Sequence, residues 1–317
     1  MKTIYLNKQT EGLSPCVATI GFFDGVHLGH RHLINKMMTV ARQENLPSTV
    51  ITFERHPRQV LCPNWRPQLL STFEEKAVML SQTGVDQLVV LPFDEAMAAL
   101  SARDFMHDVL FQQLGVRVLI TGYDNHFGHR EPGSKEGFDN YIMYGREIGM
   151  KVLQGDPFDA GDIRVSSSKV RKLLIDGRVE QAALCLGRPY ELMGEVVCGE
   201  HIGAAMGFPT ANLRLTDADK MLPAAGVYAV KVRLENSLEL KHGMMNIGHR
   251  PTFDGTVQTL ETHIFRFGDD VYGQRLIVFF VSRLRSEMKF GSREALIAQL
   301  EADALLAEKA LGGGLKE

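Results

Sequence analysis

The sequence predicts a two-domain protein: an α/β domain with a Rossmann-like parallel sheet over residues 1–186, followed by an antiparallel β-barrel with a C-terminal helix over residues 187–317. Three observations lead to this prediction. The chain of 317 residues exceeds the usual size of one hydrophobic core. Its first half alternates strand and helix patterns. Its second half has closely spaced strand patterns separated by glycine, proline and aspartate.

The elements of the first half alternate strictly. β-branched runs predict strands at 17–20, 48–53, 87–91 and 116–120, and helical patterns predict helices near 31–44, 74–82 and 102–114. Such alternation is typical of a parallel sheet with helices on both faces. Ligands of these sheets bind at the carboxyl ends of the strands. The segments 21–30 and 121–133 follow the first and fourth strands, so both are candidate ligand-binding segments.

The second half begins after a helical segment, 169–186, and the domain boundary is predicted near Gly187. Five strand patterns follow, at 190–199, 226–235, 238–248, 259–268 and 275–285. The apolar stripe over 292–311 has helical period. An antiparallel barrel closed by a C-terminal helix accounts for this order of elements.

Composition narrows the class of protein. Hydrophobic residues make up 44% and charged residues 23%, which is typical of a globular chain. The net charge of −3 gives no field that would attract nucleic acid or an anionic membrane, so neither partner is expected. No run of about 18 apolar residues occurs. The four scattered cysteines predict a reducing, cytoplasmic location, and the oligomeric state is left open.

The segment GFFDGVHLGH, residues 21–30, is the first candidate site. Gly21, Gly25 and Gly29 allow a sharp turn and a close approach to a ligand. The following helix offers free N–H groups, which suit phosphate, and His27 and His30 are one helical turn apart. A zinc site is one alternative, although two histidines do not complete a tetrahedron. Surface histidines on an ordinary turn are another.

This segment resembles the signature of the nucleotidyltransferase superfamily, as it occurs in bacterial bifunctional riboflavin kinase/FAD synthetase enzymes. The resemblance continues in order through TFERHP, TGYDNHFG, VSSSKVRKLL, MGFPTANL, GVYAV, MNIGHRPTF, LETHIF and RLRSEMKF, and so covers nearly the whole chain. It implies that the barrel phosphorylates riboflavin with ATP to give FMN. The first domain is then an FMN adenylyltransferase, which joins AMP from ATP to FMN and gives FAD and pyrophosphate. Both reactions are expected to need Mg²⁺.

The resemblance implies that His27 and His30 contact the ATP phosphates and stabilise the charge that develops during transfer. Adenylyl transfer requires positioning and cationic or hydrogen-bonding groups around the α-phosphate, and no covalent nucleophile. The segment RVSSSKVR brings hydroxyls and positive charge, although alone it could be a plain capped helix with exposed arginines. The expected nucleotide-binding residues of this domain are Gly21, Phe23, Asp24, Gly25, Gly29, Arg164, Ser167, Ser168 and Arg171.

The chain departs from the family pattern at several places, one of which is the absence of the arginine often found two residues after the first glycine of the kinase loop, where Ala204 and Ala205 follow Gly203. Phe22 stands where the family often has asparagine, and Ser168 stands where threonine is usual, which keeps the hydroxyl. In the loop 122–138 the resemblance assigns flavin binding to Asp124 and Phe127, while the rest of the loop differs from the family.

The segment GEHIGAAMGFPTANL is glycine-rich but lacks the Gly-Lys-Ser/Thr of a Walker loop, and alone it would be a flexible loop between strands. The resemblance makes it the ATP loop of the kinase. It assigns Gly203 and Gly207 to the nucleotide, and Thr210 and Asn212 to Mg²⁺. Oxygen ligands suit magnesium, which keeps several waters and binds the phosphates.

In TLETHIF the strand alternation places Glu261, His263 and Phe265 on one face. The resemblance makes Glu261 the general base that takes the proton of the ribityl 5′-hydroxyl, whereas the alternative is a solvent-facing edge position. It also places Arg285 and Glu287 beside the flavin, although a mixed-charge helix start would explain them equally well.

Two rival functions stay open. One is a chain in which only the kinase is active because the loop 122–138 differs from the family. The other is a flavin- or nucleotide-binding regulator without turnover. The chain retains the residues expected to do chemistry in both domains, which favours the bifunctional enzyme: His27, His30, Thr210, Asn212 and Glu261.

Overall fold

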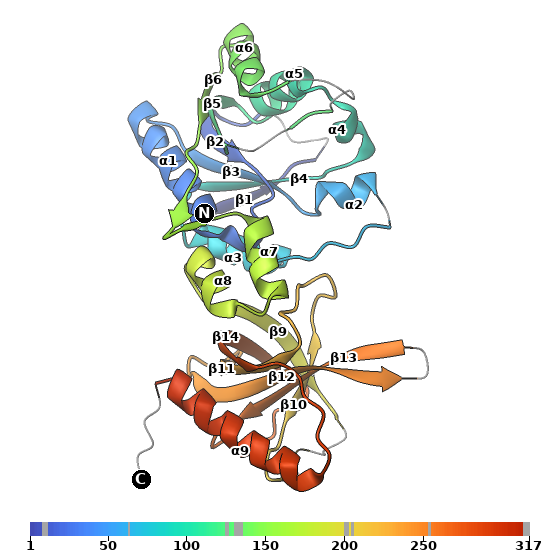
Figure 1. Cartoon of the computed structure of the whole chain (residues 1–317). Helices are drawn as coiled ribbons and strands as arrows, with labels where there is room; N and C mark the ends of the chain where they lie inside the picture. The colour runs from blue at the N-terminus through green and yellow to red at the C-terminus, as the bar shows by residue number, and fades with distance from the viewer. Residues whose placement is uncertain are drawn as a thin grey trace. The chain divides into compact units, whose positions relative to one another are not determined.

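The computed structural model describes residues 1–7, 12–62, 64–123, 127–129, 136–199, 203, 206–252 and 255–312, without the side chains of 250–257. The chain divides into two compact units, Met1–Ser167 and Ser168–Glu317 (Figure 1). The division between the units comes before the boundary predicted at 186/187, because the helical segment 169–186 groups with the barrel. The predicted domain boundary stays a prediction.

The first unit contains a parallel sheet with the strand order β1-β4-β3-β2-β5-β6. The strands are β1 Lys2–Tyr5, β2 Cys16–Ile20, β3 Ser48–Phe53, β4 Gln87–Leu91, β5 Val116–Thr121 and β6 Lys151–Gln154. The four predicted strands are the inner ones. The two edge strands, KTIY and KVLQ, are short and carry polar residues, so they lack the continuous apolar run that marks a buried parallel strand.

Helices cover both faces of this sheet, as the alternation predicted. They are η1 Asp24–Val26, α1 Leu28–Glu44, α2 Pro57–Leu61, α3 Phe73–Ser81, α4 Glu95–Ala99, α5 Ala102–Asp104, the π-helical η2 Phe105–Gln113 and α6 Phe138–Ile148. Alternate strand residues enter opposite cores: Val50 packs with α1 and α3, and Ile51 with η2 and α6. A short hairpin, β7 Asp159–Ala160 and β8 Ile163–Arg164, ends the unit.

The second unit is a closed antiparallel barrel with the order β10-β13-β12-β11-β14-β9, as predicted (Figure 1). Its elements are α7 Ser167–Ile175, α8 Val179–Leu186, β9 Tyr190–Val197, β10 Ala211–Leu215, β11 Gly226–Leu234, β12 Lys241–Thr252, β13 Gly255–Ile264, β14 Arg275–Arg285 and α9 Arg293–Ala310. Helix α7 begins at the last residue of the first unit. The short strand β10 was not predicted, although it closes the barrel by pairing with β9 and β13.

Two buried clusters hold the barrel together. Tyr228 packs edge-on against Phe280 at 5.2 Å between ring centroids, and burial raises the pKa of the Tyr228 phenol to about 12. The C-terminal helix α9 contributes Ala307 and packs with Val227 and Ala229 of β11. Within the described part of the chain, no helix has the length and apolar character needed to cross a membrane.

Candidate active sites

The segment 21–30 makes a strained turn between β2 and α1. Phe23 and Val26 have φ angles of 54° and 39°, and Gly25 has a φ of 75°. Only glycine adopts this left-handed region without cost, so the surrounding packing must hold Phe23 and Val26 in place. Both side chains are buried in the core beneath α1. Strain of this kind is concentrated at functional sites.

The two histidines lie together at the start of α1. Their rings are stacked, with centroids 3.5 Å apart and planes at 15°. His27 is the N-cap, and its Nδ1 accepts a hydrogen bond from the His30 backbone N–H at 3.1 Å. In a neutral His27 the proton must therefore be on Nε2, which is a donor. A Cβ on Gly29 would come within 3.2 Å of the His27 ring, so glycine leaves room for this arrangement.

The Asp24 side chain is buried and points toward the backbone of Leu70 and Ser71. The residue is 3% exposed, and its carboxylate accepts hydrogen bonds from the backbone N–H groups of Leu70 and Ser71 at 2.9 and 3.0 Å. The Gly25 N–H donates to the Ser71 hydroxyl at 2.9 Å. These bonds fix the turn to the segment before α3. The assignment of Asp24, Gly25 and Phe23 to nucleotide binding stays a prediction.

The second nucleotide segment meets the turn through Ser167. The Ser167 hydroxyl donates to the Asp24 carbonyl at 3.2 Å. Arg164, on β8, forms an exposed ion pair with Asp159, which raises the pKa of Arg164. Ser168 and Arg171 follow on α7 and belong to the second compact unit.

An apolar cavity of about 410 Å³ opens at the carboxyl ends of the strands, beside the turn. Its walls are mostly aromatic and aliphatic: Ile20, Gly21, Phe22, Phe53, His56, Pro57, Leu61, Phe93, Met97, Ala98, Phe105, Phe127, Gly128 and His129. Phe127, one of the two predicted flavin residues, stacks on Tyr141 with centroids 4.2 Å apart. The other, Asp124, lies outside the described residues.

Sequence reasoning assigned no role to Phe22 or His56, although both line this cavity. Their rings are in contact at 4.6 Å between centroids, and the His56 ring also contacts Trp65 at 4.8 Å. His56 caps α2: its Nδ1 accepts from the Arg58 N–H at 3.1 Å. The motif TFERHP, residues 52–57, was the sequence signal that could have predicted this cavity-lining histidine.

The barrel has a cavity of about 300 Å³, and six predicted kinase residues meet there. It is lined by Gly203, Met206, Phe208, Thr210, Asn212, Val227, Met244, Asn246, Glu261, His263, Arg285, Glu287, Met288, Phe290, Leu296 and Leu300. Glu261 is opposite Asn212 on β10 and opposite Asn246 on β12. Its strand therefore has neighbours on both sides and is not an edge. Gly207 has a φ of 84° in the loop between two lining residues.

A second barrel cavity, of about 280 Å³, shares Thr210 with the first. It is lined by Val196, Pro209, Thr210, Ala211, Thr262, Ile264, Phe267, Gly268, Asp269, Asp270, Val271 and Tyr272. Glu261 and His263 of β13 line the first cavity, and Thr262 and Ile264 line the second, which is the alternation that the sequence predicted.

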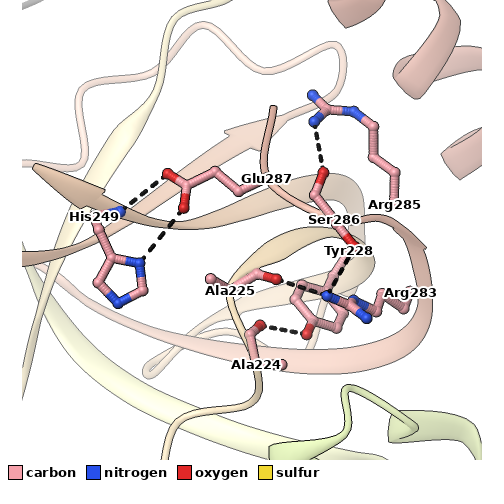
Figure 2. Close-up of polar contacts among 8 residues, drawn as sticks. All are labelled: Ala224, Ala225, Tyr228, His249, Arg283, Arg285, Ser286 and Glu287. Carbon is pink, nitrogen blue, oxygen red and sulfur yellow. Dashed lines mark hydrogen bonds and ion pairs between the residues drawn. The ribbon is translucent and has the colours of Figure 1, made fainter. Parts of the chain in front are cut away.

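Arg285 is held by the C-terminal helix. Its Nε is 2.9 Å from both carboxylate oxygens of Asp303, and its Nη2 is 2.7 Å from Oδ2. Asp303 is fully buried and also accepts from Gln299 at 2.9 Å. Arg285 Nη1 donates to the Ser286 carbonyl at 3.0 Å (Figure 2). Sequence reasoning missed Asp303, which lies within the apolar helix pattern.

Glu287 and Arg283 fix the chain on either side of Arg285 (Figure 2). One Glu287 oxygen accepts from the His249 N–H at 3.1 Å. Arg283 Nη2 donates to the Ala225 carbonyl at 2.8 Å, beside the Tyr228 hydroxyl, which donates to the Ala224 carbonyl. The wall formed by residues 283–287 is thus tied to three different parts of the barrel.

Comparison with known proteins identifies the family to which the chain with these two sites belongs. A family model for FAD synthetase matches residues 9–169, and one for riboflavin kinase matches residues 186–311. The bifunctional riboflavin kinase/FMN adenylyltransferase of Escherichia coli K12 is 37% identical over 297 residues, covering 94% of this chain and 93% of the relative. The chain belongs to this bifunctional family.

Other members of the bifunctional family are similar over the same extent. The enzyme of the same description from Haemophilus influenzae is 36% identical over 303 residues, covering 96% of each chain. A solved structure from Streptococcus pneumoniae, described as a macrolide-efflux protein, matches with a TM-score of 0.86 and 31% identity, over 97% of this chain and 99% of that one. The family resemblance seen in the sequence motifs is confirmed, and it extends through both domains.

Proposed function

We propose that this chain phosphorylates riboflavin in the barrel and adenylylates FMN in the α/β domain. The observation that carries the proposal is that each matched domain contains a cavity with the expected polar residues at its wall or mouth. In the α/β domain Gly21, the first residue of the segment that carries the stacked histidines, lines an aromatic cavity together with His56, and in the barrel Glu261, Thr210 and Asn212 line the cavity. ATP is the second substrate of both reactions.

In adenylyl transfer a phosphate oxygen of FMN attacks the α-phosphorus of ATP, and the bond from that phosphorus to the bridging oxygen of the β-phosphate breaks. Pyrophosphate leaves and FAD forms, with no covalent enzyme intermediate. His27 and His30, at the N-terminal end of α1, stabilise the charge on the transferred phosphoryl group. Ser167 and Arg164 are the expected contacts to the remaining phosphates.

The aromatic cavity is proposed to hold the isoalloxazine ring of FMN. A planar, largely apolar ring is suited to walls made of phenylalanine and histidine rings. Gly21, at the start of the histidine segment, lines the same cavity, so the flavin would lie next to the reacting phosphates.

In the kinase reaction the ribityl 5′-hydroxyl attacks the γ-phosphorus of ATP, ADP leaves, and Glu261 accepts the hydroxyl proton. The cavity bounded by Glu261, Arg285 and Glu287 is proposed to take riboflavin. The second cavity, across β13, is proposed to take the nucleotide. Thr210 lines both cavities, which supports the proposal that it lies between the two substrates.

Magnesium is proposed at Thr210 and Asn212. The donor chemistry fits, because a hydroxyl and an amide oxygen are ligands that Mg²⁺ combines with waters and phosphates. The Asn212 amide is tightly seated, since a Cβ on Gly199 would lie 2.0 Å from its Nδ2. When bound, the ion would neutralise charge on the ATP phosphates. The cytoplasm is the proposed compartment, a proposal supported by four free cysteines.

Incubating the purified protein with riboflavin, ATP and Mg²⁺, and separating FMN from FAD over time, tests the proposal. FMN should appear first and FAD later. A chain that accumulates FMN without FAD, even when FMN is supplied, would leave the kinase assignment standing and refute the adenylyltransferase.

A further inference from the structure

A buried lysine lies beneath the aromatic cavity of the α/β domain. Lys76, in the first turns of α3, is only 2% exposed. Its ammonium group donates to the Phe22 carbonyl at 3.0 Å, the Phe53 carbonyl at 3.1 Å and the Thr52 hydroxyl at 3.2 Å. An ammonium has three N–H groups, so all of its donors are used.

These bonds connect the carboxyl ends of two neighbouring strands. Phe53 ends β3, and Phe22 follows the end of β2. The Thr52 hydroxyl, which accepts from Lys76, also donates to the Phe22 carbonyl at 3.2 Å, so the network is closed. Phe22 and Phe53 both line the aromatic cavity. The ammonium thus fixes the backbone of two cavity walls at once.

The charge also acts on the Phe22 ring. The Lys76 ammonium lies 4.1 Å from the ring centroid, within cation–π range, while His56 contacts the same ring. Asp24, in the histidine segment, is the carboxylate whose charge acts on Lys76. Lys76 and His56 thus contact the Phe22 ring from two different elements, and Asp24 acts on Lys76 from a third.

Burying a charge in this position is costly for the fold. Burial lowers the pKa of the Lys76 ammonium to about 8, and the nearby Asp24 carboxylate only partly opposes this. A methionine of similar length would fill the same space without a desolvation cost. A perturbed lysine behind the wall of a ligand cavity, with every donor used, is an arrangement expected at functional sites.

We propose that Lys76 is a positioning residue for FMN adenylylation: its ammonium holds Phe22 and Phe53 in the geometry that receives the flavin ring beside His27 and His30. The proposal rests on the proposed function of this cavity. Lys76 does not touch the reacting atoms, and its effect passes through Phe22, one of the residues at which this chain departs from the family pattern.

The test uses the full-length protein and its single tryptophan, Trp65. Because Trp65 contacts His56 at the cavity wall, FMN bound in this cavity should quench its fluorescence. Titration with FMN gives a Kd for wild type, K76M and the control K151M, which changes an exposed lysine of the same domain. FMN adenylylation and riboflavin phosphorylation are measured on the same samples.

K76M is expected to raise the Kd of FMN by about tenfold or more, the size of a lost hydrogen bond to a charged group. It should lower kcat/KM for FMN by a similar factor and leave riboflavin phosphorylation unchanged. K151M should behave as wild type. The milder variant T52V removes one acceptor of the Lys76 ammonium and keeps the ammonium itself, so it should raise the Kd of FMN by less than K76M does. T52V replaces K76M in the test if K76M does not fold.

Two results overturn the proposal, and they are distinguishable. If K76M and T52V bind and adenylylate FMN as K151M does, Lys76 has only a structural role and the cavity assignment stands. If FMN adenylylation by wild type proceeds without any change in Trp65 fluorescence, the cavity is not the flavin site, and the proposed function of the cavity fails together with the role of Lys76.

Discussion

The ion pair between Arg285 and Asp303 gives the sharpest test of how the C-terminal helix supports the kinase site. Asp303→Ala removes a fully buried carboxylate that accepts three contacts from Arg285. The Arg285 side chain is 16% exposed, so water can only partly replace the lost partner. Breaking a buried pair from one side costs about 3–5 kcal/mol, much of it from the charge left behind. The barrel of D303A should therefore be less stable by about that amount.

Urea denaturation, followed by circular dichroism, measures this loss against a matched variant on the same helix. Glu308→Ala removes the partner of Arg266, whose side chain is 78% exposed, and should cost less than about 1 kcal/mol. The double variant R285M/D303L should recover much of the stability, because no charge remains unpaired. The KM of this double variant for riboflavin should nevertheless be higher than that of wild type, because Arg285 lines the barrel cavity proposed to take riboflavin. Equal stability of D303A and E308A would refute the reasoning.

Four further predictions concern the two sites and their domains. His30→Ala should lower FAD formation from FMN by about 100-fold or more, because it removes a group at the transferred phosphoryl centre, and should leave FMN formation intact; near-normal FAD synthesis would contradict the assignment. Glu261→Gln should lower riboflavin phosphorylation by about 100-fold or more while FAD forms from supplied FMN, and joint loss of both activities would make Glu261 structural. A fragment from Ser168 to the C-terminus should fold and make FMN but no FAD, whereas a fragment from Ala183 should be less stable, because it lacks the Glu180 carboxylate that accepts from the Arg283 N–H; equal melting temperatures would count against this. Lys76 has a folded pKa of about 8, below its ordinary 10.5, so the folded state binds fewer protons than the unfolded state between these values. The unfolding free energy of wild type should then rise relative to K76M by about 3 kcal/mol from pH 8 to pH 10.5, and a constant difference in paired denaturation curves would exclude it.

The sequence predicted those parts of the fold in which periodicity is strong. The strands β2 to β5 are buried and apolar, and the alternation in β13 placed Glu261 and His263 on one face. Strand β10 escaped prediction because ANLRL is five residues long and follows a glycine-rich loop, so its pairing with β9 and β13 determines it more than its own pattern does.

The site residues divide in the same way. Residues within motifs, such as His27 and Asn212, could be located because the motif fixes their neighbours along the chain. Lys76 and Asp303 could not, since each lies in a helix whose local pattern gives no reason for a buried charge. Their partners are distant in sequence: Lys76 binds Phe22, and Asp303 binds Arg285. Such roles depend on tertiary contacts, which one sequence alone does not show.

Strand β13 separates the two barrel cavities. The register of its hydrogen bonds with β12 therefore determines which of its side chains face each cavity. Glu261 and His263 face one chamber while Thr262 and Ile264 face the other. A slip of one residue against β12 would exchange the two sets, because side chains alternate along a strand. The carboxylate would then face the second cavity, in a barrel with the same strands and the same composition. Insertions or deletions within β13 should thus abolish turnover even in variants that close the barrel.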